Sequence, residues 1–211
     1  MTITKKTRLL PAPFVGTRIL IKLDDADSLT WGFTSIKLAE GHEKAVVDWG
    51  DGTKEEFADC GQLTHTYPKI GGYEVRISDN LSLYRCSERS TGSVFHTVYA
   101  PMIRQVHLTS QLLEEVGNYS YMNAANLQAF RCDGSGLRIL NSGAFADCIS
   151  LNGRLDFPEI KDIGVNTFGR CLGVTELHFS ATNEAIIKAL PAWEESGGKF
   201  GAMNATVYFD L

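Results

Sequence analysis

Two aspartates beside a glycine-rich turn are the first residues whose types and spacing suggest chemistry. Asp48 and Asp51 lie in the stretch VVDWGDGTKEEF, where their carboxylates could contribute to a calcium site. Calcium takes six or more oxygen ligands, so two carboxylates alone are weak support for such a site. An Asp-Gly pair is a strong β-hairpin signal, and an aspartate side chain accepts hydrogen bonds from turn N–H groups. We therefore expect Asp51 to stabilise a turn.

The five cysteines are the next candidates, for metal binding, disulfides or redox chemistry. They are Cys60, Cys86, Cys132, Cys148 and Cys171. None forms a CxxC pair, which argues against zinc, and their odd number and wide spacing make a poor disulfide framework. The last three fall at interior positions of a repeat, so we expect buried thiols that act as small hydrophobic side chains. The alternative for Cys148 with Cys171 is a metal or redox role.

Polar residues at alternate positions of repeated strands form the candidate binding surface. Alternate side chains of a strand point to opposite faces, so these residues are expected to line the outer face of stacked strands. The middle positions are His107, Arg131, Asp156 and His178, and their neighbours are Gln105, Ala129, Arg154 and Glu176. His107, Asp156 and His178 would lie about 10 Å apart, too far for one metal ion. We predict a partner-binding face, with a solvated face that binds nothing as the alternative.

The elements that would position these residues fall into two halves, and the first half is rich in predicted strands. Residues 18–23 and 73–78 alternate apolar and polar side chains, residues 29–38 alternate in part, and residues 44–57 are expected to form a hairpin around Gly-Asp-Gly. Glycine and aspartate interrupt the chain at short intervals, and no helical period appears. This pattern is typical of a small all-β sandwich.

Three ordered motifs in the first half point to a known family. They are Trp49-Gly50-Asp51-Gly52, His65-Thr66-Tyr67 and Gly72-Tyr73-Glu74-Val75. Over about residues 16 to 80 the chain resembles the polycystic-kidney-disease (PKD) domain, an immunoglobulin-like β-sandwich. The resemblance implies a non-catalytic spacer or binding module of an extracellular protein. It also implies that His65 is structural, bonding in a corner beside Tyr67.

The second half repeats with a period of about 23 to 24 residues from Ile103 onwards. Four sets of apolar positions recur in register: Val116, Leu140 and Ile163; Tyr121, Phe145 and Phe168; Ala124, Cys148 and Cys171; Leu127, Leu151 and Val174. One repeat cannot bury its own apolar face, so stacked repeats must supply the core of a solenoid. The segment Leu151 to Leu155 holds one extra residue, which predicts a local bulge.

The motif AFADCISL, residues 144–151, is echoed by TFGRCLGV in the next repeat. It resembles the BspA-like leucine-rich repeat, whose signature is A-F-x-x-C-x-x-L, over about residues 100 to 180. The first repeat departs from the signature, with Tyr121 and Ala124 at the Phe and Cys positions. A PKD-like module followed by such repeats is similar to surface or adhesion-type proteins of gut and oral bacteria and of their phages.

The C-terminal residues are expected to cap the solenoid. Residues 182–193 suit a helix that begins near Thr182 or Asn183 and is ended by Pro191, and residues 205–209 suit a last strand. The predicted fold class is therefore mainly β, with three parts. A PKD-like sandwich spans residues 1–80, a junction or degenerate repeat spans 81–102, and a leucine-rich-repeat solenoid with a helix-strand cap spans 103–211.

Composition and charge exclude several classes of function. The chain has 211 residues and a formal net charge of −5, and no Lys/Arg cluster follows residue 8, so no nucleic-acid partner is expected. No apolar run approaches the length of a membrane helix, so no membrane insertion is expected. The N-terminal stretch MTITKKTRLLPAPFVGT has prolines in its apolar part and no clean cleavage site. We interpret it as the lead-in to a strand rather than a signal peptide.

The motif search also argues against an enzyme. The sequence holds no nucleophile elbow, phosphate loop, HExxH or paired-carboxylate signature, so we expect no catalytic residues, metal or cofactor. The predicted function is a recognition or adhesion module of the extracellular space or cell surface. It would bind a protein or glycan of a host or neighbouring cell through the solenoid strand face, and the lack of aromatic residues on that face favours a protein or no ligand. The alternative is a structural spacer or phage virion component, in a virion or in the cytoplasm.

Overall fold

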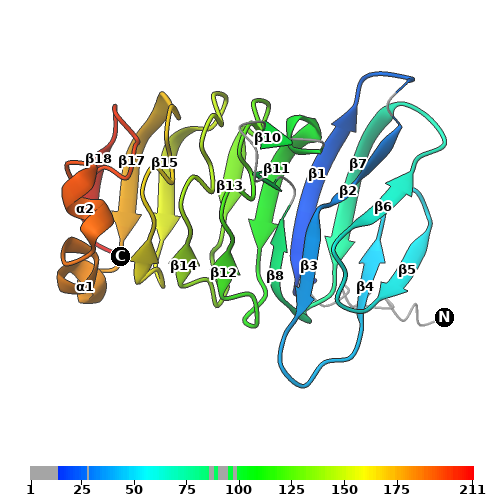
Figure 1. Cartoon of the computed structure of the whole chain (residues 1–211), viewed down its shortest axis with the longest axis horizontal. Coiled ribbons are helices and arrows are strands. Elements are labelled where there is room, and N and C mark those ends of the chain that lie inside the picture. The colour runs from blue at the N-terminus through cyan, green and yellow to red at the C-terminus, as the bar shows by residue number, and fades with distance from the viewer. Residues whose placement is uncertain (1–13, 28, 86–87, 90–94, 97–98) are drawn as a thin grey trace, which may run out of the picture.

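The structure is a computed structural model of the chain, and it describes residues 14–27, 29–85, 88–89, 95–96 and 99–211. The architecture is mainly β, with a β-solenoid of about three turns and short helices near the C-terminus. Strands lie side by side along the long axis of the molecule (Figure 1). The N-terminal part occupies one end and the C-terminal cap the other.

One six-stranded sheet joins the N-terminal part of the chain to the solenoid (Figure 1). Its strands lie in the order β13 (Ala129–Arg131), β11 (Ile103–Leu108), β1 (Thr17–Leu23), β7 (Gly71–Ile77), β4 (Ala45–Asp48) and β5 (Lys54–Phe57). All neighbours are antiparallel except β11 and β13, which are parallel. Because β1 pairs with both β7 and β11, the predicted parts 1–80 and 103–211 share a sheet.

The other strands of the N-terminal part form two antiparallel pairs whose apolar residues join the same core. The pairs are β2 (Thr30–Phe33) with β6 (Leu63–Thr66), and β3 (Ser35–Leu38) with β8 (Leu81–Arg85). Trp31 and Phe33 on β2 pack against Trp49, which follows β4, with ring centroids 6.4 and 6.2 Å from its own. The strand pairs and the six-stranded sheet therefore contribute aromatic side chains to one buried cluster.

The predicted junction contains one strand, β8, that contacts both halves. Strand β8 pairs with β3 of the N-terminal part and lies beside β12 (Glu115–Val116) of the solenoid (Figure 1). The junction also holds β9 (Glu88–Arg89), β10 (Phe95–His96) and a 3-10 helix (Ala100–Met102). A single hydrophobic cluster extends from Ile19 to Ala205, so the core is continuous across the junction.

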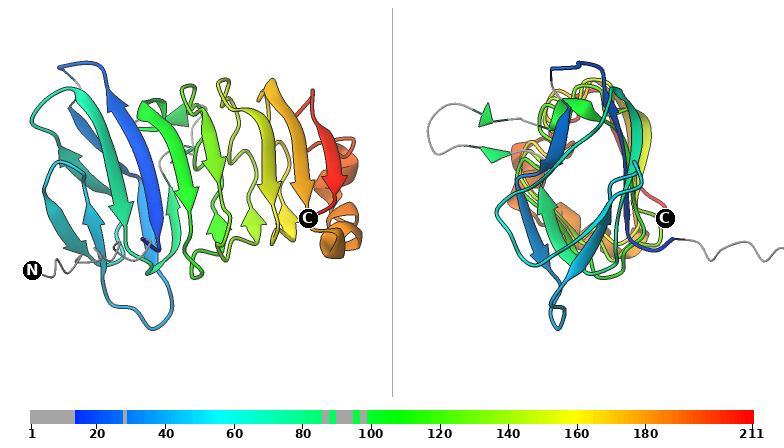
Figure 2. Two further views of the ribbon diagram at one scale, coloured as in Figure 1. Left: turned by 180° about the vertical axis from the view of Figure 1, so that it is seen from behind. Right: turned by 90° about the vertical axis from the view of Figure 1, so that its right-hand side faces the viewer.

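The solenoid has parallel strands on two faces, as the repeat predicts. The back strands are β12, β14 (Ile139–Leu140) and β16 (Asp162–Ile163), and the front strands that follow β13 are β15 (Asn152–Phe157), β17 (Gly173–Phe179) and β18 (Thr206–Phe209). Seen along the long axis, the successive turns superpose (Figure 2). The back-strand register of Val116, Leu140 and Ile163 is confirmed.

The C-terminal cap contains two short helices where one was predicted. Helix α1 (Glu184–Lys188) and helix α2 (Pro191–Glu195) follow a 3-10 helix (Ala181–Asn183). Pro191 begins α2 as well as ending the preceding helix, because proline suits the first helical turn, where no intrahelical N–H donor is needed. Asn183 does not cap α1 with its side chain, which donates to the carbonyl of Ile160 instead. The predicted last strand is confirmed as β18.

Candidate functional site

The strand pairing places the predicted face residues in two aligned groups. On the first pair of strands, His107 lies opposite Arg131, and Gln105 lies opposite Ala129. On the second pair, Asp156 lies opposite His178, and Arg154 lies opposite Glu176. Gln105, Arg131, Arg154 and Asp156 are exposed, and His107 and Glu176 are partly exposed. These six side chains lie on one outer face, as expected from the alternation of the strands.

His178 differs from the other predicted face residues, because only 4% of it is exposed. Its Nδ1 lies 2.7 Å from Asp210 Oδ1, and its Nε2 lies 2.9 Å from Glu176 Oε2. The ring of Tyr208 stacks on the imidazole at 4.5 Å between centroids. His178 lies on the outer face beside Tyr208, but it is covered there, and Asp210 and Glu176 bond its two nitrogens.

The face is longer than the sequence indicated. Pairing in the six-stranded sheet extends it from His107 to Arg18 on β1 and then to Arg76 on β7, and pairing with β18 adds Tyr208 beside His178. We call the complete line the central row: Lys54, Asp48, Arg76, Arg18, His107, Arg131, Asp156, His178 and Tyr208. The alternation of side chains in β1 and β7 places Arg18 and Arg76 on an outer face. The repeat pattern of the sequence, however, does not predict that β1 pairs with β11.

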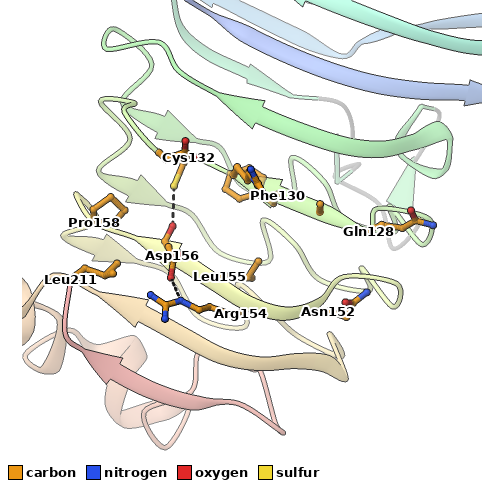
Figure 3. A pocket seen from close by; sticks show the side chains of 12 residues that line it. Gln128, Phe130, Cys132, Asn152, Arg154, Leu155, Asp156, Pro158 and Leu211 are labelled. Carbon is orange, nitrogen blue, oxygen red and sulfur yellow. Dashed lines mark hydrogen bonds and ion pairs between the residues drawn. The ribbon is translucent and has the colours of Figure 1, made fainter.

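The strand ladder is interrupted between β13 and β15, which belong to different sheets. A groove of about 500 Å³ lies there on the front face (Figure 3). The register of β15 against β17 shifts between Gly153 and Arg154, inside the segment predicted to bulge. A bulge bends its strand, and this one lies in the strand that lines one side of the groove. Its volume is within the range of small-molecule sites, about 300–1,000 Å³.

The groove has charged and amide walls over an apolar floor. Arg131, Asp133, Arg154, Asp156, Gln128 and Asn152 supply the polar groups, and Phe130, Leu155, Pro158 and Leu211 supply apolar surface (Figure 3). Arg154 Nε donates a hydrogen bond of 2.6 Å to Asp156 Oδ1, and this bond raises the pKa of Arg154. Arg131 makes no ion pair with any residue that the structure describes. The groove therefore offers one unpaired guanidinium among partly paired charges.

Cys132 lines the same groove but is not a nucleophile at neutral pH. Its Sγ donates to the carbonyl oxygen of Asp156 at 3.3 Å (Figure 3). Burial, with the nearby carboxylates of Asp133 and Asp156, raises the pKa of the thiol to about 12. A thiol with such a pKa is protonated at neutral pH, and the thiolate is the reactive form.

The other repeat cysteines are buried hydrogen-bond donors. Cys148 Sγ donates to the carbonyl of Tyr121 at 3.2 Å, and Cys171 Sγ donates to the carbonyl of Phe145 at 3.0 Å. Both side chains are fully buried, and burial raises the pKa of Cys148 well above its usual value. The prediction of buried thiols in the repeat is confirmed. Cys60 is partly buried, and Cys86 lies outside the described residues.

Asp51 closes the turn that the sequence predicts. Its Oδ1 accepts hydrogen bonds from Thr53 N at 3.0 Å and Thr53 Oγ1 at 2.6 Å, and its Oδ2 accepts one from His65 Nε2 at 2.8 Å. Burial alone would raise the pKa of Asp51, but the bonds from Thr53 and His65 outweigh it and lower the pKa to about 2. The His65 ring stacks on Trp49 at 5.0 Å between centroids and meets Tyr67 edge-on at 4.7 Å.

We expect Asp51→Asn to lower the free energy of unfolding by about 2 kcal/mol at pH 7. The folded-state pKa of Asp51, about 2, is below the ordinary aspartate value of 3.8, so this stability is present above about pH 4 and is lost as pH falls towards 2. Urea unfolding at several pH values checks the prediction. The variant should unfold with a weaker pH dependence than wild type between pH 4 and 2. Asp162→Asn, at an exposed site on β16, is the control and should retain the wild-type profile.

No group of three His, Cys, Asp or Glu side chains that could hold a metal ion is present in the described part of the chain. The turn of Asp48 and Asp51 accordingly shows no such group. No helix among the described residues is long and apolar enough to cross a membrane.

Comparison with known proteins identifies no relative of this chain. No protein-family model, no curated protein and no solved structure matches it. The resemblances to PKD domains and to BspA-like repeats stay predictions from the motifs.

Proposed function

We propose that this protein is a non-enzymatic recognition module that binds a protein or glycan partner through the front strand face of its solenoid. The observation that carries the proposal is the groove between β13 and β15, which opens among Arg131, Arg154 and Asp156. A concave site with a few converging polar groups over apolar surface is the usual form of a small binding site. The proposed partner belongs to a host or neighbouring cell, and the proposed location is extracellular or at a cell surface.

The module identities that we propose are a PKD-like, immunoglobulin-like sandwich and BspA-like leucine-rich repeats. The turn at Asp51 with its bond to His65, and the Tyr67 hydroxyl that donates to the carbonyl of Trp49 at 3.2 Å, support the first. The bonds of Cys148 and Cys171 to carbonyls of the preceding repeat support the second.

One exposed aromatic side chain on the front face, Tyr208, favours a glycan partner. The sequence predicted no aromatic residue there and so favoured a glycan less. Tyr208 is 39% exposed at the end of the central row, where the sequence predicted no aromatic residue. An aromatic ring presents an apolar face and, in tyrosine, a polar hydroxyl, which suits partly polar ligands.

We expect the triple variant Arg131→Ala, Arg154→Ala, Asp156→Ala to lose binding by about tenfold or more, because a few buried contacts dominate most interfaces. The ligand for this test is first identified by screening glycans and extracellular proteins for binding to the purified chain. The matched control is Arg138→Ala, Lys161→Ala, Asp162→Ala, which removes the same charges from exposed positions beside the back strands. A ligand bound equally by wild type and the triple variant would place the site elsewhere.

The second candidate is a structural spacer or virion component, and the open end of the front sheet favours it. Strand β18 is the last strand of its sheet, and Met203 just before it is 68% exposed. An unpaired strand edge is a template for pairing with another chain. If the screen yields no ligand and sedimentation shows stable self-association, the structural role replaces the recognition role.

A further inference from the structure

Four cationic or protonatable side chains stand next to one another in the middle of the central row. Arg76 on β7 lies opposite Arg18 on β1, Arg18 opposite His107 on β11, and His107 opposite Arg131 on β13. Neighbouring strands of a sheet are about 4.8 Å apart, so successive groups follow one another at that spacing. We call Arg76, Arg18, His107 and Arg131 the cationic section. It is a run of basic side chains in a chain whose net charge is −5.

Two of the four side chains of the cationic section have an ion-pair partner: Arg76 Nε lies 2.6 Å from Glu74 Oε1, and His107 Nε2 lies 3.4 Å from Asp133 Oδ1. Neither Arg18 nor Arg131 forms an ion pair within the part of the chain that the structure describes. Arg18 Nε and His107 Nε2 are buried and have no hydrogen-bond partner among the described residues, although Asp133 Oδ1 lies 3.4 Å from the histidine. Buried donors without acceptors are unfavourable, and an anion seated over the row would offset part of that cost.

Phe14 holds two of these arginines in place. The Arg18 guanidinium lies 5.4 Å from the centroid of the Phe14 ring, and the Arg76 guanidinium lies 5.9 Å from the same centroid. Arg18 Nη2 also donates to the Phe14 carbonyl at 3.3 Å. Cation–π contacts of this kind leave guanidinium N–H groups free to donate elsewhere. The arginines are therefore ordered before any ligand arrives, which reduces the entropic cost of binding.

The cationic section leads directly into the groove, because Arg131 belongs to both. Beyond Arg131 the groove adds the amides of Gln128 and Asn152 and the carboxylates of Asp133 and Asp156. Carboxylates and amides accept hydrogen bonds from hydroxyl groups, whereas guanidinium groups bind carboxylate or sulfate. A ligand complementary to both parts must carry hydroxyl donors and anionic groups together.

We propose that the cationic section and the groove bind an acidic polysaccharide. Its carboxylate or sulfate groups lie on Arg18 and Arg131, and its hydroxyls reach Asp133 and Asp156. An acidic peptide fits less well, because glutamate side chains would bring only further carboxylates to the two aspartates. This proposal rests on the proposed function and names the ligand class of the same face.

Binding of defined polymers to the full chain tests the proposal. The probes are polygalacturonate for carboxylated sugars, dextran sulfate for sulfated sugars, neutral dextran and poly-glutamate. We expect the chain to bind at least one acidic polysaccharide and not neutral dextran, with an affinity that falls as salt is raised. The preference between polygalacturonate and dextran sulfate then assigns the anionic group.

Matched variants locate the site. Arg131→Gln should weaken binding by about tenfold, because it removes a charge-assisted contact, and Arg18→Gln should weaken it independently. The control is Arg138→Gln, at a position beside back strand β14 where the side chain is 55% exposed, and it should bind as wild type does. Thermal unfolding of each variant shows whether the fold is retained, and Arg131 is exposed enough for its variant to fold.

Three results would overturn the proposal. They are no binding of either acidic polysaccharide at low salt, equal binding by wild type and both front-face variants, and equally tight binding of poly-glutamate with the same dependence on Arg131. The last result would assign the site to acidic peptides. If the acidic polysaccharides fail while a screen ligand is lost in the triple variant, the proposed function stands and only this ligand class is wrong.

Discussion

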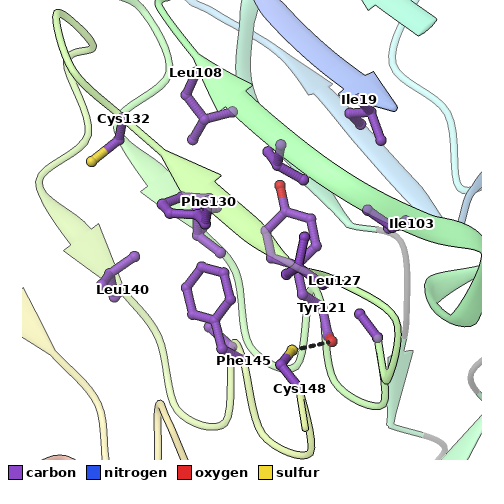
Figure 4. Packing of buried hydrophobic residues seen from close by; sticks show 14 of the residues in the cluster. Ile19, Ile103, Leu108, Tyr121, Leu127, Phe130, Cys132, Leu140, Phe145 and Cys148 are labelled. Atoms are coloured by element: carbon purple, nitrogen blue, oxygen red, sulfur yellow. Dashed lines mark hydrogen bonds between the residues drawn. The ribbon is translucent and has the colours of Figure 1, made fainter. Parts of the chain in front are cut away.

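Replacing Phe145 with alanine is expected to lower the free energy of unfolding by about 3–5 kcal/mol, the usual cost of emptying a large aromatic site in a core. Phe145 is fully buried between Tyr121 and Phe168, whose rings stack on it at 5.2 and 5.4 Å between centroids. Phe130 meets it edge-on at 4.7 Å (Figure 4). The cavity would therefore interrupt the column that joins three successive repeats.

Denaturant unfolding followed by circular dichroism measures this effect. Ile149→Ala is the matched control, because Ile149 lies in the same repeat and is 60% exposed. It should change the free energy of unfolding by no more than about 0.5 kcal/mol. A loss below about 1 kcal/mol for Phe145→Ala would contradict the stacked column.

Gly50→Ala is expected to destabilise the N-terminal part by about 2–4 kcal/mol, from backbone strain and steric overlap together. Gly50 has a φ of +83°, and a Cβ at this position would lie 2.5 Å from the carbonyl oxygen of Glu74 on β7. That atom belongs to the backbone of a central strand, so no side-chain rotation relieves the clash. The turn would have to move away from the sheet.

Gly52→Ala separates backbone strain from steric overlap. Gly52 has a φ of +100°, but a Cβ added there would meet open space. It should cost about 1–2 kcal/mol, the backbone strain alone. The difference between the two variants in urea unfolding reports the close approach of the turn to β7. Equal costs would show that the turn does not contact that strand closely.

Most of the local structure could be predicted from the sequence, because each turn, strand and repeat depends on residues close together along the chain. The Asp51 turn follows from Asp-Gly chemistry, and the aromatic column of Tyr121, Phe145 and Phe168 follows from a fixed repeat length. The burial of Cys148 and Cys171 follows from the same period. The orientation of six face residues, Arg131 among them, follows from alternation along a strand.

The helical cap shows the limit of such local rules. Pro191 was predicted to end a helix, and it also begins the next one, because proline is suited to both roles. Asn183 has the residue type of a cap, but its side chain bonds to Ile160 in the neighbouring turn of the solenoid. A tertiary contact therefore decided which hydrogen bond the asparagine makes.

The sequence by itself determined the strands, the repeat, the turns and which residues face outward, since these depend on neighbours along the chain. Only the tertiary structure decided which outward residues meet. Pairing of Arg18 with His107 joins segments 89 residues apart, and nothing in the periodicity encodes that register. The burial of His178 under Tyr208 and the groove beside Arg131 arise in the same way. Both depend on contacts between strands that are distant in sequence. The proposed site is formed by such contacts.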